Sequence, residues 1–148
     1  MHEEFFAKKT YKAKFVSSIL IPMEKTIITS DQAPAPIGPY NQAIQANNML
    51  FISGQICIDP ETGGLRNKTL QEETHQVMNN LRAILQKSGM DFENVVKTTI
   101  FITDMNRFSE MNEVYGKYFS GNFPARETVQ VSALPKFVNV EISMIAVK

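Results

Sequence analysis

The sequence predicts an α+β domain in which a mainly antiparallel sheet carries two helices over one face. Short segments rich in β-branched and aromatic residues lie near both ends of the chain, two inner segments have apolar residues at helical spacing, and a further strand candidate separates them. This order of strands, helix, strand, helix and strands is typical of α+β folds. With 148 residues, 43% of them hydrophobic, we expect one domain, residues 23–148, after an extension of unknown role, residues 1–22.

An antiparallel meander is expected to open the domain. Residues 31–39 are rich in proline and glycine and predict a fixed loop that leads into Tyr40. Residues 41–46 and 49–53 are strand candidates, and the Asn47-Asn48 pair between them suits a tight hairpin because asparagine tolerates positive φ.

The clearest helix is predicted over residues 70–88. Thr69 followed by Glu72 matches a capping box, and Gly89 suits a left-handed stop. Its helically spaced apolar residues are Leu70, Val77, Met78, Leu81, Ile84 and Leu85.

A strand, a second helix and two further strands are predicted after it. Residues 95–103 form the strand, and Asp104 and Asn106 are candidate caps for the helix. The apolar stripe of that helix comprises Phe108, Met111, Val114, Tyr115, Tyr118 and Phe119. The last strand candidates are residues 127–134 and 138–147.

Polar residues in these last two strands are the first functional candidates. Arg126, Thr128, Gln130 and Ser132 alternate with Val129, Val131 and Ala133, and Glu141 interrupts a strongly apolar strand. Because side chains alternate faces along a strand, we expect these residues to share the face opposite the helices. Solvated charges or a cross-strand ion pair would explain the pattern, and alternation alone favours that interpretation. The functional alternative is a site in which a guanidinium group binds a carboxylate through two parallel bonds.

Spacing adds a constraint on such a site. If Pro135-Lys136 centres a hairpin, Glu141 lies opposite Gln130, and Arg126 is about four residues further along, roughly 13 Å away at about 3.3 Å per residue. That distance is long for two groups that hold one small molecule. A second copy of the chain could supply the missing side, and the open polar face makes self-association plausible.

Composition argues against several classes of protein. The formal net charge is zero, which removes the basic excess expected of a general nucleic-acid binder, and no apolar run is long enough to span a membrane. Cys57 is the only cysteine, so no intrachain disulfide can form and a cytoplasmic location is expected. With His2 and His75 far apart in the sequence, a structural metal site is not expected.

An ordered set of short motifs resembles the RidA/YjgF family of enamine/imine deaminases. The matching stretches are, in order, Ile37-Gly38-Pro39-Tyr40, Asn41-Gln42-Ala43, Ser53-Gly54-Gln55, Lys97-Thr98-Thr99, Asp104-Met105-Asn106, Asn112-Glu113-Val114-Tyr115, Pro124-Ala125-Arg126, Leu134-Pro135 and Val140-Glu141-Ile142. No single triplet is specific, but the ordered set is. The resemblance implies a chorismate-mutase-like fold that assembles as a homotrimer with sites between subunits. It also implies hydrolysis of 2-aminoacrylate and related imines to 2-keto acids and ammonia, without a metal or organic cofactor.

The resemblance assigns roles to particular residues. Arg126 matches the arginine that binds the substrate carboxylate, and Glu141 matches the glutamate that positions water and moves protons. The other positions that it places in the cleft are Tyr40, Ser53, Gly54, Asn106 and Thr128, the last standing where many relatives have cysteine. Two other functions stay open: a non-catalytic module that binds small carboxylates such as 2-keto acids, and a ribonuclease, which the neutral charge disfavours.

Overall fold

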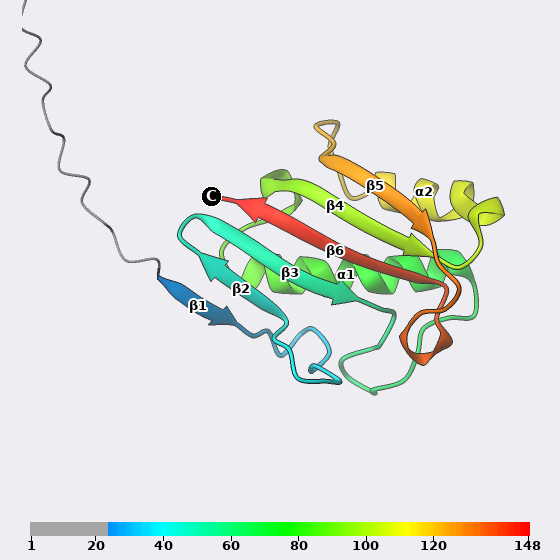
Figure 1. Cartoon of the computed structure of the whole chain (residues 1–148), viewed down its shortest axis with the longest axis horizontal. Coiled ribbons are helices and arrows are strands. Elements are labelled where there is room, and N and C mark those ends of the chain that lie inside the picture. Colours follow the sequence, from blue (N-terminus) through cyan, green and yellow to red (C-terminus); the bar gives the residue numbers. More distant parts are fainter. Residues whose placement is uncertain (1–23) are drawn as a thin grey trace, which may run out of the picture.

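A computed structural model describes residues 24–148, and the expected extension, residues 1–22, lies outside the described residues. Within this range one six-stranded sheet is covered on one face by two helices, as Figure 1 shows. The strands are β1 (Lys25–Ile28), β2 (Ala43–Ala46), β3 (Met49–Gln55), β4 (Val95–Ile102), β5 (Ala125–Gln130) and β6 (Val140–Val147), and the helices are α1 (Leu70–Lys87) and α2 (Phe108–Gly116). The predicted α+β class is therefore confirmed.

The last strand in the sequence lies inside the sheet. The strand order is β1-β2-β3-β6-β4-β5, with β6 antiparallel to both β3 and β4. β5 pairs in parallel with β4, and α2 provides the crossover between them. In Figure 1 β1 and β5 form the two edges of the sheet, and α1 runs behind its middle.

The prediction of a hairpin around Pro135-Lys136 is wrong. β5 and β6 are not neighbours, and Glu141 pairs with Phe101 of β4 rather than with Gln130. The physical reason is burial. Every second residue of β6 is buried and the others are half-buried, which suits a central strand, whereas five of the six residues of β5 are exposed, which suits an edge.

Local signals at the early turns and at α1 are confirmed. Asn47 has φ of 54°, as the hairpin between β2 and β3 requires. The Thr69 side chain accepts a hydrogen bond from the Glu72 N–H at 3.1 Å, and Gly89 has φ of 68° after the helix. The Glu72 carboxylate bonds to the Lys68 N–H, one residue earlier than a reciprocal capping box requires.

Two elements differ from the expected pattern. β1 pairs with β2 at the sheet edge, but three of its four residues are exposed and it lacks the alternation that would reveal a strand. The second helix begins with a single 3₁₀ turn, Met105–Arg107, capped by the Asp104 carboxylate, before α2 starts at Phe108.

The core lies between α1 and the middle of the sheet. The helix contributes fully buried Leu81, Ile84 and Leu85, and the sheet contributes Ile100 and Ile142. Burying each such side chain stabilises the fold by about 1.5–3 kcal/mol. α1 also buries polar Glu73 and Asn80, at 0% and 1% exposure, on the face that meets the sheet.

A buried amide fixes the proline-rich loop before β2. The side chain of Gln42 donates to the carbonyls of Ser30, Ala33 and Pro34 at 2.8–3.1 Å and accepts from the Ser30 N–H at 2.7 Å. Every hydrogen-bonding group of this amide is therefore used within a loop that has no regular secondary structure. The predicted fixed loop owes its shape to this amide as well as to its prolines.

Candidate functional site

Glu141 lies in a pocket on the face of the sheet away from α1. It is the second residue of β6, and its neighbours in that strand, Val140 and Ile142, are fully buried on the helix side. The pocket has a volume of about 260 Å³ and is lined by Ile37, Tyr40, Ser53, Gly54, Ile56, Pro135 and Glu141. Four predicted site residues, Glu141, Tyr40, Ser53 and Gly54, are thus brought together.

Gly54 makes room for the Glu141 side chain. A Cβ atom at position 54 would lie 2.7 Å from Cδ of Glu141, which is closer than such atoms can approach. The pairing of β3 with β6 is irregular between Ile52 and Gln55, so Gly54 sits where the ladder is interrupted. The absence of a side chain here lets the carboxyl group lie over the backbone of β3.

The pocket raises the pKa of Glu141. The cause is desolvation, because burial disfavours the charged carboxylate. Within residues 24–148 the carboxyl group has neither an ion-pair partner nor a hydrogen bond to compensate. A carboxyl group of this kind exchanges protons closer to neutral pH than an exposed glutamate does.

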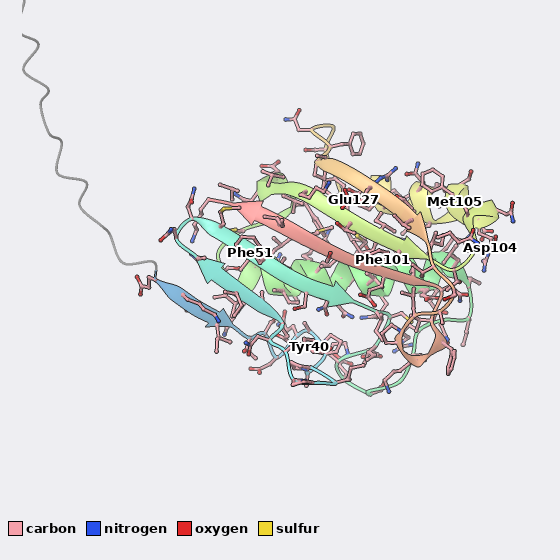
Figure 2. The ribbon with its side chains drawn as sticks, viewed as in Figure 1. Tyr40, Phe51, Phe101, Asp104, Met105 and Glu127 are labelled. Carbon is pink, nitrogen blue, oxygen red and sulfur yellow. The ribbon has the colours of Figure 1, made fainter. Side chains whose placement is uncertain are left out.

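Tyr40 and Ser53 lie at the edge of this pocket, and Ser53 bonds β3 to the loop. The Tyr40 hydroxyl accepts from the Ile37 N–H at 3.2 Å, and the ring remains 43% exposed. The Ser53 hydroxyl donates to the Asn41 carbonyl at 2.7 Å. Figure 2 shows Tyr40 on the loop below the sheet, at a distance from Met105 and Asp104 beside α2.

Arg126 lies on the opposite side of the sheet from Glu141. It pairs with Thr98, whose buried hydroxyl accepts from Tyr115 of α2 at 3.2 Å. The guanidinium donates to Asn112 Oδ1 at 2.8 Å, and its carbon lies 4.9 Å from the ring centroid of Tyr115 and 5.5 Å from that of Phe108. Arg126 is therefore held on the face that α2 covers.

The expectation that Arg126, Thr128 and Gln130 share the open face with Glu141 is wrong. Thr128 and Gln130 pair with Ile100 and Ile102, which are buried on the helix side. The other phase of β5 faces the open side, where Glu127 bonds to Lys97 and Thr99. In Figure 2 Glu127 lies on the same face as Phe51 and Phe101. Both phases of this edge strand contain polar residues, so polarity could not reveal which phase faces the helices.

Two shallow clefts meet at Arg126. One, of about 430 Å³, is lined by Asn112, Tyr115, Gly116, Phe123, Pro124 and Arg126. The other, of about 510 Å³, is lined by Met105, Phe108, Ser109, Arg126 and Thr128. The Thr128 hydroxyl oxygen is buried without a hydrogen-bond partner in the described part of the chain, so a bound molecule could satisfy it.

Asn106, another predicted site residue, lines neither the Glu141 pocket nor the Arg126 clefts. Its amide donates to Asp104 Oδ1 at 2.9 Å. Sequence reasoning missed Asn112, which fixes Arg126, and it assigned Tyr115 only to the core. The apolar stripe of α2 does not reveal that Asn112 and Tyr115 contact the guanidinium group of Arg126.

The predicted site residues thus form two separate groups within one chain. Glu141, Tyr40, Ser53 and Gly54 line one pocket, whereas Arg126 and Thr128 line clefts beyond the edge of the sheet. None of these three hollows is lined by both Arg126 and Glu141.

Other chemistries find little support in the described residues. The Cys57 thiol is buried, and burial, followed by the charge of Glu73, raises its pKa to about 12, so it is a poor nucleophile. Between residues 24 and 148 no cluster of three or more His, Cys, Asp and Glu side chains could bind a metal ion. No helix in that range is both long and apolar enough to cross a bilayer.

Gly54→Ala should displace the Glu141 side chain from its pocket. The added methyl group occupies the space of the carboxyl group, so the side chain turns toward solvent and its pKa falls toward the ordinary value. ¹³C NMR titration of Glu141 measures this change. Gly64→Ala is the matched control, because a Cβ there meets only Thr62 Oγ1, at 3.4 Å, and Gly64 does not line the Glu141 pocket. A Glu141 pKa that is the same in both variants would contradict the steric argument.

Glu141→Gln should stabilise the protein at neutral pH. A raised folded-state pKa means that the native state binds more protons than the unfolded state, so stability falls as pH rises from about 4.3 to the folded value. Glutamine removes this loss. Urea denaturation between about pH 3.5 and 7.5 should show a stability difference only at the upper end. Both proteins should carry Arg126→Ala, so that the guanidinium group of a second copy of the chain cannot stabilise the charged Glu141 carboxylate. A difference independent of pH would refute the explanation.

Comparison with known proteins gives a consistent result. A family model described as Endoribonuclease L-PSP matches residues 30–148. The chain is 50% identical to a RutC family protein of Pyrococcus horikoshii, with 84% of this chain and 98% of the relative covered. It is 48% identical to the 2-iminobutanoate/2-iminopropanoate deaminase of Mus musculus, with 84% and 92% covered.

Solved structures share the fold and the sequence. The YjgF gene product of E. coli is 39% identical with a TM-score of 0.80, and the match covers 83% of this chain and 98% of that one. The structure of E. coli TdcF with bound serine is 40% identical, also with a TM-score of 0.80, and the match covers 83% and 98%. With a family model matched over most of its length and relatives near 50% identity, this chain belongs to the RidA/YjgF family, the Endoribonuclease L-PSP family.

Proposed function

We propose that the protein hydrolyses reactive 2-aminoacrylate-type enamines and their imines to 2-keto acids and ammonia. The observation that supports this most is the half-buried Glu141 carboxyl group, whose raised pKa suits proton transfer and whose pocket contains no strong nucleophile. A mouse relative named 2-iminobutanoate/2-iminopropanoate deaminase adds support. The single buried cysteine fits a cytoplasmic location.

The chemistry needs an anchor, a water molecule and one proton-transfer group. Arg126 binds the substrate carboxylate through the guanidinium N–H groups that Asn112 does not use. Protonated Glu141 gives its proton to the methylene carbon of the enamine, which yields an iminium ion. The resulting carboxylate takes a proton from water as the water oxygen adds to the iminium carbon. Return of that proton to nitrogen lets ammonia leave. As the C=O bond forms, the carbinol hydroxyl gives its proton to the Glu141 carboxylate, which restores the protonated group without a cofactor.

We further propose that each site forms between two subunits of a homotrimer. Arg126 and Glu141 occupy separate hollows on opposite sides of the sheet, so a second copy has to bring its Arg126 cleft to the Glu141 pocket. The open face of the sheet offers apolar contact area for such an assembly, since Phe51 and Val129 are 41% and 45% exposed. A ring closed in this way has three equivalent sites.

The alternative is a module that binds small carboxylates without changing them. The E. coli TdcF structure supports this alternative, because that relative was solved with a small amino acid, serine, bound. Saturable 2-keto acid binding without faster imine hydrolysis would favour the binding module. The neutral charge of the chain gives an RNA-cleaving activity no comparable support.

Arg126→Ala should lower kcat/KM for imine hydrolysis by about tenfold to a hundredfold. Charge-assisted hydrogen bonds contribute about 1.5–3 kcal/mol, and roughly 1.4 kcal/mol corresponds to a factor of ten. The assay follows keto acid release after a dehydratase generates 2-aminoacrylate. Arg82→Ala is the matched control, because Arg82 also stacks on two rings, Phe92 and Tyr118, but lies in a separate cleft. Full activity in Arg126→Ala would remove the anchor from the proposal.

Mixing two impaired variants tests whether sites form between subunits. Arg126→Ala and Glu141→Gln chains, unfolded together and refolded as one population, should regain activity. A quarter of the sites, on the order of one per hybrid ring, would combine an intact Arg126 from one chain with an intact Glu141 from another. The same variants refolded separately and then combined serve as the control. Activity that stays at the background of the separate variants would mean that each chain forms its own site.

A further inference from the structure

Glu73 of α1 places a carboxyl group inside the hydrophobic core. Its exposure is 0%, and within residues 24–148 no lysine or arginine lies within ion-pair distance of it. Its carboxylate is satisfied by three N–H donors instead. Oε1 accepts from the main-chain N–H groups of Asn139 at 2.5 Å and Val140 at 3.0 Å, and Oε2 accepts from the Asn139 side chain at 3.0 Å.

These bonds hold the two residues that immediately precede Glu141. The chain arrives there from a turn in which Lys136 and Phe137 both have φ of 56°, a conformation that residues other than glycine rarely adopt. On its other side, Asn139 accepts from the Thr103 N–H at 3.0 Å. The start of β6 is thus clamped between α1 and the end of β4.

The planar end of the Glu73 side chain meets all three donors. One oxygen bonds to both main-chain N–H groups and the other bonds to the Asn139 side chain. Buried donors are costly when they lack a partner, so the strand is held where these bonds can form. This arrangement fixes where the strand begins along the axis of α1.

We propose that Glu73 is a positioning residue that sets the place of the Glu141 carboxyl group in its pocket. This inference rests on the proposed function only in that it assigns a role to Glu141 in catalysis. A displacement of about 1 Å in a reacting group can lower a rate a hundredfold. Glu73 does not line the pocket, so it acts on Glu141 through its bonds to Asn139 and Val140.

A second polar residue of α1 acts on the other side of the same pocket. Asn80, seven residues after Glu73 and on the same helix face, donates to the carbonyls of Ile56 at 3.0 Å and Ile58 at 2.9 Å. Ile56 lines the Glu141 pocket. One helix therefore holds both the strand that bears the carboxyl group and the segment that faces it.

Two conservative variants separate positioning from folding. Glu73→Gln keeps a carbonyl oxygen that can accept both main-chain bonds, and Asn139 can rotate its amide because its partner, the Thr103 hydroxyl, can donate or accept. Glu73→Asp keeps the charge but shortens the side chain by one methylene, so the bonds can form only if the strand moves. We expect near wild-type kcat in Glu73→Gln and a decrease of about tenfold in Glu73→Asp, with KM within about twofold in both.

Thr74→Val is the matched control for a purely structural role. Thr74 is equally buried, next to Glu73, and its hydroxyl bonds only to the Leu70 carbonyl of its own helix. A structural role would make kcat follow stability alike in Thr74→Val and Glu73→Asp. If Glu73 positions Glu141, kcat falls in Glu73→Asp but not in Thr74→Val when both variants are compared at the same fraction of folded protein.

¹³C NMR titration of Glu141 gives a readout that needs no activity. In Glu73→Asp the loosened carboxyl group gains solvent, so its pKa should fall toward the ordinary value, while Glu73→Gln leaves it unchanged. An unshifted Glu141 pKa in Glu73→Asp overturns the inference even if the enzyme is active. A shifted pKa in a protein that hydrolyses no imine keeps the positioning role and removes the proposed function.

Discussion

The central position of β6 is the constraint on which the other features depend. This strand bonds to β3 on one side and β4 on the other, and its helix-facing residues form the middle of the core. Any side chain on its opposite face therefore has a rigid base. Glu141 is placed on that base, at the end of the strand where the chain enters the sheet. The packing and pairing of β6 thereby offset the free-energy cost of partly burying the Glu141 carboxyl group.

The arginine side of the site depends on a different element. β5 joins the sheet only through β4, and its parallel pairing turns Arg126 toward α2, where Asn112 and two rings fix the guanidinium group. Arg126 and Glu141 thus belong to the edge and to the centre of one sheet, and they face away from each other. Under the proposed assembly, the geometry between them is set by subunit packing rather than by the fold of one chain.

Local features of the fold could be predicted from the sequence, whereas pairing partners could not. Asn47 and Thr69 act within a few residues of themselves, so their roles as turn and cap follow from residue type. The partner of β6 depends on burial across the entire sheet, and the spacing around Pro135 suggested a hairpin that does not exist. β1 is too short and too exposed for a pattern to reveal it.

Some residues of the candidate site could likewise be predicted from the sequence, and others could not. Family motifs identified Glu141, Tyr40, Ser53 and Gly54, which do share a pocket. Alternation failed for Arg126, because Glu127 adds a charged residue to the other phase and five of the six residues of this edge strand are exposed. Glu73 was not singled out at all, since a glutamate near the start of a helix ordinarily favours the N-terminal dipole and gives no sign of contacts 66 residues away.

The turn before β6 bears on the motions of the molecule. Two successive residues with left-handed backbone, Lys136 and Phe137, each add roughly 1–2 kcal/mol of conformational cost, and the three bonds to Glu73 oppose it. The start of β6 therefore combines a conformational cost with the hydrogen bonds that offset it. Proteins open locally where the opening free energy is lowest, so loss of the bonds to Glu73 would favour fraying of this strand end while the core stays closed. The carboxyl group of Glu141 follows directly after this segment, and its surroundings depend on bonds that α1 makes.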